Sequence, residues 1–262
     1  MIKNTFLMLD GVGEKTEKLL WQKGILSWDD FMVSDRLPRS IGSKRYLFNE
    51  MLTYFTNELS QDNEKPFAEF IKKSDHWRLY DHFKESAICL DIETNGLPAS
   101  NGGDITVVGL YDHAGFRQYV KGVNLTEDAI FSELSSSKLL ISFYGSVFDM
   151  PFLSHHYRSL ADLTIPHFDL CFAGRRAGLS GGLKKIEAHL GLKRDDSIDL
   201  LNGYDAVKLW GKWENGDRDA LETLLYYNEA DTVNLMHIAN IIYDRLFEKS
   251  GFSRFHAKFS DQ

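Results

Sequence analysis

A short apolar run that carries two carboxylates constrains this chain more than any other segment. Residues 87–92 (AICLDI) are rich in strand formers, and the run stops at Asn95-Gly96, which predicts a buried β-strand ending in a turn. Asp91 and Glu93 are two residues apart, so they point to the same face of that strand. Neighbouring carboxylates near a core are unfavourable unless a positive charge compensates them, and a divalent cation does so. The sequence therefore predicts a site for a hard metal ion.

Two further acidic residues stand in settings that can bring them to the same place. Residues 219–246 show the helical spacing of apolar side chains, and this spacing puts Tyr227 and Asp231 on one helical face, one turn apart. Asp149 follows the apolar run 139–143 and a Tyr144-Gly145 break, which predicts a junction between a strand and a helix. One strand, one helix and this junction can then converge on a single acidic cluster.

These motifs, in this order, resemble the DEDD superfamily of 3′-to-5′ exonucleases, which have an RNase H-like fold, and specifically its tyrosine-type branch. The family pattern is Asp-x-Glu on the first strand, a later Phe/Tyr-Asp, and Tyr-x-x-x-Asp on the last helix; this chain contains all three. The segments LDIETNGL, FDMPFL, GGLKKIE, HLGLKR and YNEADTVNL are similar to the prokaryotic YprB-type group. The resemblance spans residues 85–245, and the ordered set is far more specific than any single motif.

The resemblance implies a two-metal-ion site. Its metal ligands would be four carboxylates, Asp91, Glu93, Asp149 and Asp231, which supply the oxygen ligands that Mg²⁺ and Mn²⁺ prefer. Asp91 would bridge the two ions. One ion would activate water and the other would hold the leaving group. Tyr227 would orient the attacking water, since a phenol with a reference pKa of about 10 is a weak base at neutral pH.

Two other positions bear on the assignment to the tyrosine-type branch. The sister branch would have a histidine at position 226, where this chain has Tyr226, so the tyrosine-type assignment is the better one. Relatives often have Asn-Gly a few residues before the second aspartate, whereas this chain has Tyr144-Gly145 there. The departure affects a polar contact near the site and leaves the metal ligands in place.

The N-terminal segment contains a second motif. Gly11-Val12-Gly13 predicts a tight turn that opens an amphipathic helix, with Leu19 and Leu20 facing inward and Gly24 ending it. The segment resembles a helix-hairpin-helix module, whose glycine turn presents backbone N–H groups to a nucleic-acid phosphate. Gly11, Gly13 and Lys15 are the candidate contacts, and a less complete second copy begins at residue 39. The alternative is a small helical packing domain with an ordinary glycine turn.

The charge distribution limits how the chain can bind nucleic acid. Residues 1–48 contain 8 Lys/Arg and 6 Asp/Glu, a net of +2, so the remaining 214 residues carry 22 against 32, a net of −10. This argues against a large, strongly basic groove and predicts modest, salt-sensitive binding. Lys184 and Lys185 lie in the first turn of a helix opened by Gly181-Gly182, so they are candidate contacts, with solvated lysines as the alternative.

Composition and targeting signals fit a cytoplasmic enzyme. A chain of 262 residues with 43% hydrophobic content can form one substantial core and a small appended domain. No apolar run approaches 18 residues and the N-terminus lacks a signal-peptide pattern, so we expect cytoplasmic localisation and no membrane partner. Cys89 and Cys171 lack a paired-ligand spacing, which predicts reduced core residues and no zinc site.

The segments predict a mixed α/β, RNase H-like fold with a small all-α N-terminal domain. We expect the helical domain at residues 1–58, a linker and connecting helix at 59–84, the RNase H-like domain at 85–250 and a tail at 251–262. Three leading strands are followed by alternating helices and strands up to IPHFDL, with helices after it, which is the order that the resemblance requires. The tail interleaves phenylalanines with basic residues, so it could stack on bases or pack on its own domain.

We therefore expect a metal-dependent 3′-to-5′ exonuclease that acts on nucleic-acid ends, with single-stranded DNA as its substrate. The polarity rests on the resemblance alone, and DNA is favoured over RNA because the hairpin module is commonest on DNA-processing proteins. The first alternative is an RNA-trimming exonuclease. The second is a nucleic-acid-binding or scaffold protein that keeps the fold without turnover. The sequence points to no particular protein partner.

Overall fold

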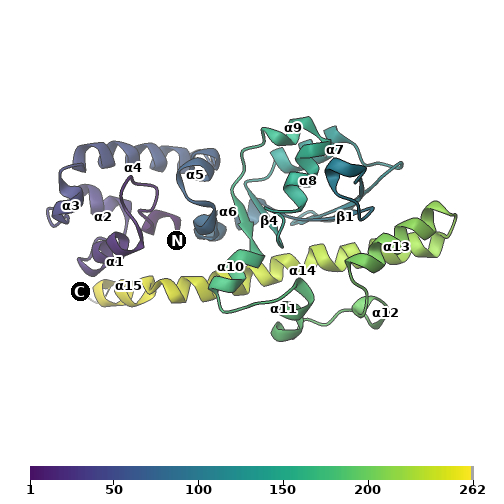
Figure 1. The fold of residues 1–262 in the computed structure, drawn as a ribbon. Helices are drawn as coiled ribbons and strands as arrows, with labels where there is room; N and C mark the ends of the chain where they lie inside the picture. Colours follow the sequence, from purple (N-terminus) through teal and green to yellow (C-terminus); the bar gives the residue numbers. More distant parts are fainter. Residues whose placement is uncertain (261–262) are drawn as a thin grey trace.

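A five-stranded mixed sheet lies at the centre of the C-terminal two-thirds of the molecule (Figure 1). The computed structural model describes residues 1–260. The strands lie in the order β3-β2-β1-β4-β5, with these bounds: β1 (Ala87–Thr94), β2 (Ile105–Asp112), β3 (Gly115–Val120), β4 (Leu139–Ser142) and β5 (His167–Asp169). Neighbours among β1, β2 and β3 are antiparallel, whereas β4 is parallel to β1 and β5 to β4. This architecture confirms the predicted α/β class and the predicted β2–β3 hairpin.

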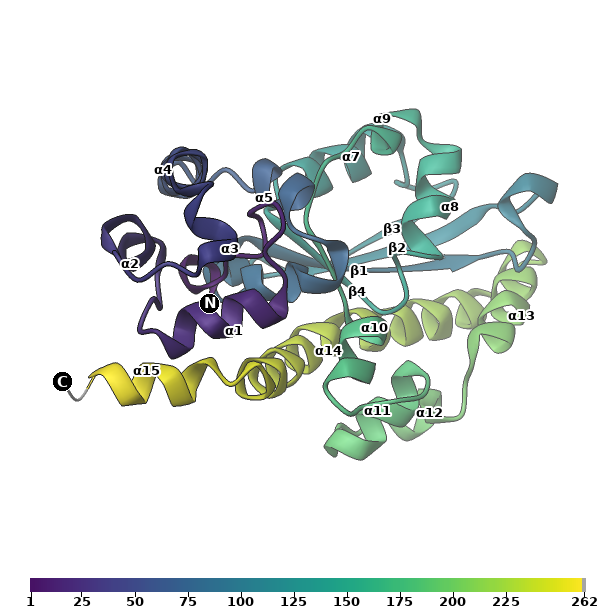
Figure 2. The same cartoon turned by 60° about the vertical axis from the view of Figure 1, so that its left-hand side comes forward.

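Helices cover both faces of the sheet (Figures 1 and 2). One face is covered by α7 (Glu127–Ser135), α8 (Asp149–His156) and α9 (Arg158–Ala161). The other face packs against the long α14 (Arg218–Ser250). The segment between β5 and α14 is helical, as predicted, and comprises α10 (Leu170–Arg176), α11 (Leu183–Leu190), α12 (Asp196–Asp199) and α13 (Gly203–Glu214).

The alternation of side chains along β1 divides the core into two layers. Ile88, Leu90 and Ile92 belong to the cluster that packs against α7, α8 and α9. Cys89 belongs to the cluster on the α14 side. Because side chains two apart share a face, the residues after Cys89 on that face, Asp91 and Glu93, also lie toward α14. The pattern therefore places two carboxylates where a continued core would have apolar side chains.

The N-terminal part is a small helical assembly. It contains η1 (Ile2–Asn4), α1 (Glu14–Gln22), α2 (Trp28–Val33), α3 (Arg39–Gly42) and α4 (Arg45–Ser60). The expectation that Leu19 faces inward is wrong, because its side chain is 39% exposed. The inward face of α1 is formed instead by Glu17, Leu20 and Trp21, which have the i, i+3, i+4 spacing of one helical stripe.

The predicted connecting helix of residues 67–84 is not a single helix. This segment contains short pieces: α5 (Lys65–Phe70), η2 (Lys73–Leu79), α6 (Tyr80–Phe83) and η3 (Lys84–Ser86). Only Lys73 and Ser74 of η2 are exposed, and every residue from Asp75 to Leu79 is buried, so the rest of η2 has no exposed face of the kind that an amphipathic helix requires. Its polar side chains have specific partners instead: the backbone N–H of His167 donates to His76 Nδ1 at 2.9 Å.

The C-terminal helix returns to the N-terminal helices. Gly251, in the left-handed region at φ 80°, ends α14, and α15 (Phe252–Ser260) then lies beside α1 (Figure 2). Phe252 is 4% exposed and its ring centroid lies 5.2 Å from that of Trp21. The described part of the tail therefore packs on the N-terminal region, and the Phe252 ring is not available to stack on bases. Residues 261–262 of the predicted tail lie outside the described range.

Two remaining sequence expectations concern cysteines and membranes. Cys89 and Cys171 are both free and buried. Across residues 1–260, every helix is too short or too polar to cross a bilayer.

Candidate active site

The first two carboxylates of the site come from the end of β1. Asp91 pairs with Gly109 of β2 and Glu93 with Val107, so both positions are held by the antiparallel ladder. The register shifts between Glu93 and Thr94, just beyond the acidic pair. Glu93 is 8% exposed. The strand therefore presents both carboxylates in a fixed direction toward α14.

A glycine in the neighbouring strand lets α14 approach the sheet closely. A Cβ atom at Gly109 would lie 2.3 Å from Asn228 Oδ1 and 2.4 Å from Thr232 Oγ1, so no larger residue fits without displacing the helix. At this distance Asn228 Nδ2 donates a hydrogen bond to Asp91 Oδ2 at 2.9 Å. The close packing brings the next turn of α14, which carries Asp231, to the end of β1.

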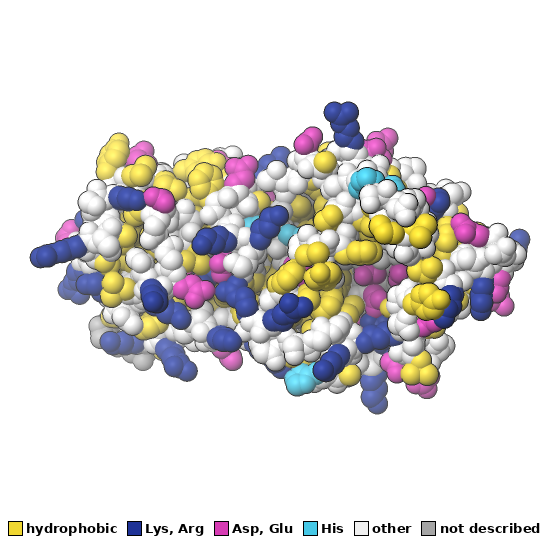
Figure 3. All heavy atoms as spheres, in the orientation of Figure 1, with side chains coloured by type: hydrophobic (Ala, Val, Ile, Leu, Met, Phe, Trp, Pro, Cys, Tyr) yellow, Lys and Arg dark blue, Asp and Glu magenta, His cyan; other side chains and the backbone are white. Residues whose placement is uncertain are grey.

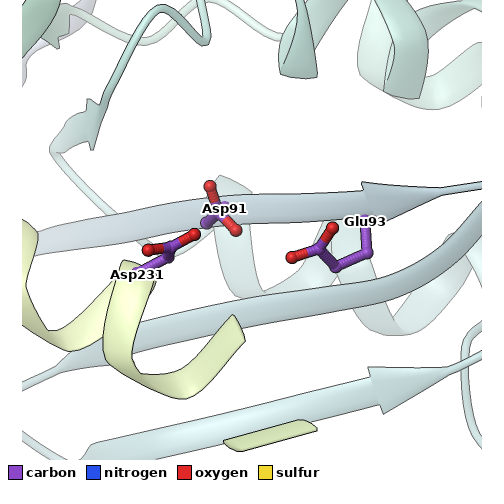
Figure 4. Close-up of side chains that lie close together, drawn as sticks. All are labelled: Asp91, Glu93 and Asp231. Atoms are coloured by element: carbon purple, nitrogen blue, oxygen red, sulfur yellow. The ribbon is translucent and has the colours of Figure 1, made fainter. Parts of the chain in front are cut away.

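Three of the predicted ligands meet in one cluster. Asp91, Glu93 and Asp231 each offer a carboxylate oxygen, and these three atoms lie within 4.8 Å of one another. Figure 4 shows the side chains of β1 and α14 pointing toward one another. Oxygen ligands lie roughly 2.0–2.6 Å from Mg²⁺ or Ca²⁺, so a spacing of this size suits one bound divalent cation. The donor set therefore fits a hard metal ion.

Asp149 lies in the same cleft but outside this three-residue cluster. It is the first residue of α8, which follows β4 after a short loop, and it is 4% exposed. Its Oδ1 accepts a hydrogen bond from the backbone N–H of Ile92 at 3.1 Å, which ties it to β1 between the other two carboxylates. A Cβ atom at Gly145 would lie 2.2 Å from Ser142 Oγ and 3.2 Å from Asp149 Oδ2, so this turn requires a glycine.

Burial and mutual repulsion raise the pKa of the acidic residues. Desolvation is the largest cause for Asp91 and Glu93, and the charge of Asp231 adds to it, so both carboxyl pKa values lie well above their usual range. Burial raises the pKa of Asp149 to about 7. A bound cation would oppose these shifts by favouring the ionised forms.

Arg194 is a component of the site that the sequence reading did not single out. Its side chain is 2% exposed and forms ion pairs through Nη2 with Asp231 Oδ1 and, at 2.6 Å, with Glu187 Oε2. Asn234 Nδ2 donates to Glu187 Oε1 at 2.8 Å. Burial raises the pKa of the Asp231 carboxyl, and Arg194 opposes that shift. The only sequence signal for Arg194 is its place at the end of HLGLKR, one of the segments that carry the family resemblance.

Tyr227 is held as a neutral phenol beside the cluster. Its side chain is 6% exposed, and burial together with the charge of Asp231 raises its pKa. Lys184 Nζ lies 5.3 Å from the ring centroid and the Arg194 guanidinium 5.7 Å from it. The hydroxyl can therefore donate a hydrogen bond but does not ionise at neutral pH.

Of the five predicted nucleic-acid contacts, Lys184 lies near the acidic site, beside the Tyr227 ring, while the glycine turn and Lys15 belong to the N-terminal helices. Gly11, Gly13 and Lys15 are exposed around the start of α1, where Gly13 is the N-cap residue. Lys185 is exposed, but Lys184 Nζ donates to carbonyl oxygens after α11, including that of Asp199 at 2.7 Å. None of the five lines the acidic cleft among the residues described. Their contact with nucleic acid stays a prediction.

The acidic residues line a cleft of about 930 Å³, which Tyr227 and Asp149 also line. Figure 3 shows acidic side chains at the base of a hollow with hydrophobic side chains around it. The rim includes exposed aromatic rings: Tyr144 (43%), Phe148 (44%) and Tyr204 (69%). Tyr144 has φ 67°, in the left-handed region, and its backbone N–H donates to Asp169 Oδ1 at 3.0 Å. The Tyr144 departure therefore puts an aromatic ring at the mouth of the cleft.

Comparisons with known proteins agree with this architecture. A family model for the RNase H superfamily matches residues 88–243. Because the match covers more than half of the chain, the protein belongs to the RNase H superfamily. The matched region holds most of β1 and of α14, together with the five predicted site residues, Asp91, Glu93, Asp149, Tyr227 and Asp231.

A solved structure adds a more distant similarity. The family B DNA polymerase from the hyperthermophilic archaeon Pyrobaculum calidifontis is similar to this chain with a TM-score of 0.47 and 12% sequence identity. The similar region covers 62% of this chain and 24% of the polymerase, so the chain spans about a quarter of that protein's length. No match was found among curated proteins.

Proposed function

We propose that this protein is a metal-dependent 3′-to-5′ exonuclease that hydrolyses single-stranded DNA from its end. The observation that carries the proposal is the meeting of Asp91, Glu93 and Asp231, with oxygens within 4.8 Å, in an open cleft of an RNase H superfamily member. Buried acidic groups that repel one another are costly to keep without a cation, so their retention supports a metal site. The 3′-to-5′ polarity rests on the DEDD resemblance.

The proposed ligands of two Mg²⁺ or Mn²⁺ ions are Asp91, Glu93, Asp149 and Asp231. Bound divalent ions would lower the pKa of an attacking water and stabilise charge on the leaving oxygen. Other residues of the chain hold these carboxylates in place. Asn228 fixes the orientation of Asp91 by hydrogen bonding, and Arg194 holds Asp231.

Tyr227 is proposed to hold the attacking water. Its neutral hydroxyl lies on the same face of α14 as Asp231, one turn away, and it lines the cleft. A neutral phenol can donate a hydrogen bond to water or to a phosphoryl oxygen, whereas it cannot serve as a strong base at neutral pH. The proton of the attacking water would therefore leave to solvent or to a carboxylate.

A single strand is the proposed substrate form because of the cleft's rim. Tyr144, Phe148 and Tyr204 expose aromatic rings around the acidic floor, and unstacked bases gain about 1–3 kcal/mol each by stacking on such rings. A paired duplex end keeps its bases stacked inside the helix and cannot use these surfaces. DNA is proposed over RNA because the turn at Gly11–Gly13 resembles a helix-hairpin-helix module, which is commonest on DNA-processing proteins.

The test is degradation of a 5′-labelled DNA oligomer with Mg²⁺ or Mn²⁺. We expect a ladder that shortens from the 3′ end and is abolished by EDTA and by Asp91→Ala. Asp219→Ala, which alters an exposed carboxylate of α14, is the matched control and should cleave like wild type. A circular single strand, which has no end, should stay intact.

The remaining outcomes separate the alternatives. Cleavage of the circle would establish an endonuclease and contradict the proposal. Cleavage of a matched RNA oligomer alone would assign RNA trimming. Binding without any cleavage would assign the non-catalytic, nucleic-acid-binding role.

A further inference from the structure

We propose that a second site, a pocket between the N-terminal helices and α14, binds a backbone phosphate of the nucleic acid whose end occupies the acidic cleft. This inference rests on the proposed nucleic-acid substrate. The pocket has a volume of about 240 Å³ and is lined by residues of α1, η2, α10 and α14. It is separate from the acidic cleft, since the two share no lining residue.

The floor of the pocket holds a buried cation whose hydrogen-bonding capacity is only partly used. Arg78 is 3% exposed; its Nη2 pairs with Glu17 at 3.1 Å and its Nε lies 3.7 Å from Asp75. Within residues 1–260, Arg78 Nη1 has no hydrogen-bond partner, and neither does the indole Nε1 of the adjacent Trp77, which also lines the pocket. Buried donors without partners are unusual in folded proteins, so Arg78 and Trp77 can each take a further acceptor.

The rim of the pocket adds three further cations. Lys18 of α1 is exposed and has neither an ion pair nor a hydrogen bond to another described residue. Lys249 of α14 donates to the carbonyl oxygen of Arg176 at 2.7 Å. Arg176 pairs with Asp75 at 3.2 Å and with Glu14 at 3.4 Å. Among residues 1–260, Lys18 and Lys249 therefore have no carboxylate partner, so a bound anion can balance their charge.

A phosphate group has the chemistry that this lining lacks. Lys18, Arg78, Arg176 and Lys249 carry four positive charges, and the carboxylates of Glu14, Glu17 and Asp75 carry three negative ones. The cationic side chains and the indole are donors only, and a phosphate oxygen is an acceptor only. Each contact with phosphate would therefore give one of these donors a hydrogen-bond partner. Such contacts would hold the strand without reading its sequence.

The geometry of α14 relates the pocket to the cleft. Asp231 and Lys249 are 18 residues apart on this one helix, which corresponds to about 27 Å at 1.5 Å per residue. Figure 2 shows the C-terminal part of α14 reaching α1. A strand with 3.4 Å between phosphates covers that distance with about 8 nucleotides, and a stretched strand needs fewer. Only substrates longer than a few nucleotides can therefore fill both sites.

The experiment compares affinity for long and short DNA strands. Lys18→Ala/Lys249→Ala changes only exposed side chains of the pocket, and Lys65→Ala/Lys212→Ala, also exposed and outside both sites, is the matched control. We expect the pocket variant to bind a strand of about 20 nucleotides at least fivefold more weakly than the control. Its log–log salt slope should fall by about 1.4, or about 0.7 for each lost phosphate contact. Affinity for, and cleavage of, a strand of about 4 nucleotides should not change.

Three outcomes would overturn the proposal. One is equal affinity of both double variants for the long strand, and another is an equal loss on the short strand. The third is that inorganic phosphate or a mononucleotide binds in a way that requires Lys18 and Lys249, while the pocket variant keeps its affinity for the long strand. This result would assign the pocket to a free phosphate compound. A length-dependent affinity loss in a protein that cleaves nothing would support the pocket and reject only the nuclease proposal.

Discussion

At the scale of single residues, the acidic site combines charges that repel one another with groups that hold them in place. Asp91, Glu93 and Asp231 share one small volume, and burial adds to their repulsion. Asn228 and Arg194 supply the compensating hydrogen bond and positive charge. Asn228 directly follows Tyr227 within YNEADTVNL, one of the segments that carry the family resemblance, but its type and spacing alone do not distinguish it from a solvated helical asparagine.

Removal of the Tyr227 hydroxyl should slow cleavage and leave metal binding intact. We expect Tyr227→Phe to lower the single-turnover rate by about 100-fold, because the attacking water loses its hydrogen-bond partner. Mn²⁺ affinity, measured by titration, should stay within about twofold, since a phenol is not a preferred ligand of such ions. Tyr226→Phe, at a neighbouring ring 43% exposed and outside the cleft, is the control. An unchanged rate in Tyr227→Phe would assign water positioning to another group.

At the scale of elements, the approach of α14 to the sheet determines whether the site forms. Gly109→Ala would place a Cβ atom within 2.4 Å of both Asn228 and Thr232, so α14 must move away from β2. We expect a loss of about 1–3 kcal/mol in the free energy of unfolding and weaker Mn²⁺ binding, because Asp231 moves with the helix. Gly211→Ala in α13, where an added Cβ meets nothing within 4 Å, is the control for denaturation and titration. Unchanged Mn²⁺ affinity in Gly109→Ala would show that the carboxylates do not act together.

The edge strand β5 should make the fold sensitive to acid. The pKa of His167 is lowered to about 4, chiefly by burial; the charge of Asp169 opposes this shift, and the charges of His76 and Lys73 contribute to it. The unfolded chain binds this proton near pH 6.5, so the stabilisation is complete above pH 6.5 and is lost as the pH falls toward 4. The loss is at most about 3 kcal/mol.

The measurement for His167 is chemical denaturation at a series of pH values. His167→Gln should show a shallower decline of unfolding free energy between pH 6.5 and 4 than wild type, whereas His189→Gln, at an exposed position of α11, should match wild type. Identical slopes for wild type and His167→Gln would rule out His167 as a source of the acid sensitivity.

At the scale of the whole molecule, one hydrophobic cluster joins the N-terminal helices, the sheet and α14. The cluster runs from Phe6 and Trp21 through Cys89 and Ile141 to Leu235 and Phe252. Interior packing of this kind couples the unfolding of its parts. The pocket proposed to bind phosphate lies at the same junction, where α1 meets the end of α14.

Truncation of Phe252 should therefore destabilise the entire protein. We expect Phe252→Ala to reduce the free energy of unfolding by about 3–5 kcal/mol, with one transition seen by both tryptophan fluorescence and far-ultraviolet circular dichroism. Phe131→Ala, at a ring 38% exposed on α7, should cost much less. Two separate transitions, with the sheet unaffected by Phe252→Ala, would instead favour residues 1–58 and 85–250 as independent folding units.

Local patterns in the sequence were sufficient for the class of fold and for the acidic candidates. The strand run around Asp91, the break at Tyr144-Gly145 and the helical period around Asp231 each depend on neighbouring residues, and local preferences decide such elements. The inward direction of Leu19 was wrong, because α1 turns the stripe of Glu17, Leu20 and Trp21 inward. The single connecting helix of residues 67–84 was wrong because η2 is buried on all sides from Asp75 to Leu79.

Only the tertiary structure decided which distant groups meet. Close packing over Gly109 brings Asn228 to Asp91. The loop after α11 places Arg194 beside Asp231, and α15 packs against Trp21. Partners that are far apart along the chain leave no periodic signal in one sequence, since their contact depends on the path of the whole chain. The sequence alone thus determined the elements and the chemistry that they carry, while long-range packing determined the geometry in which that chemistry acts.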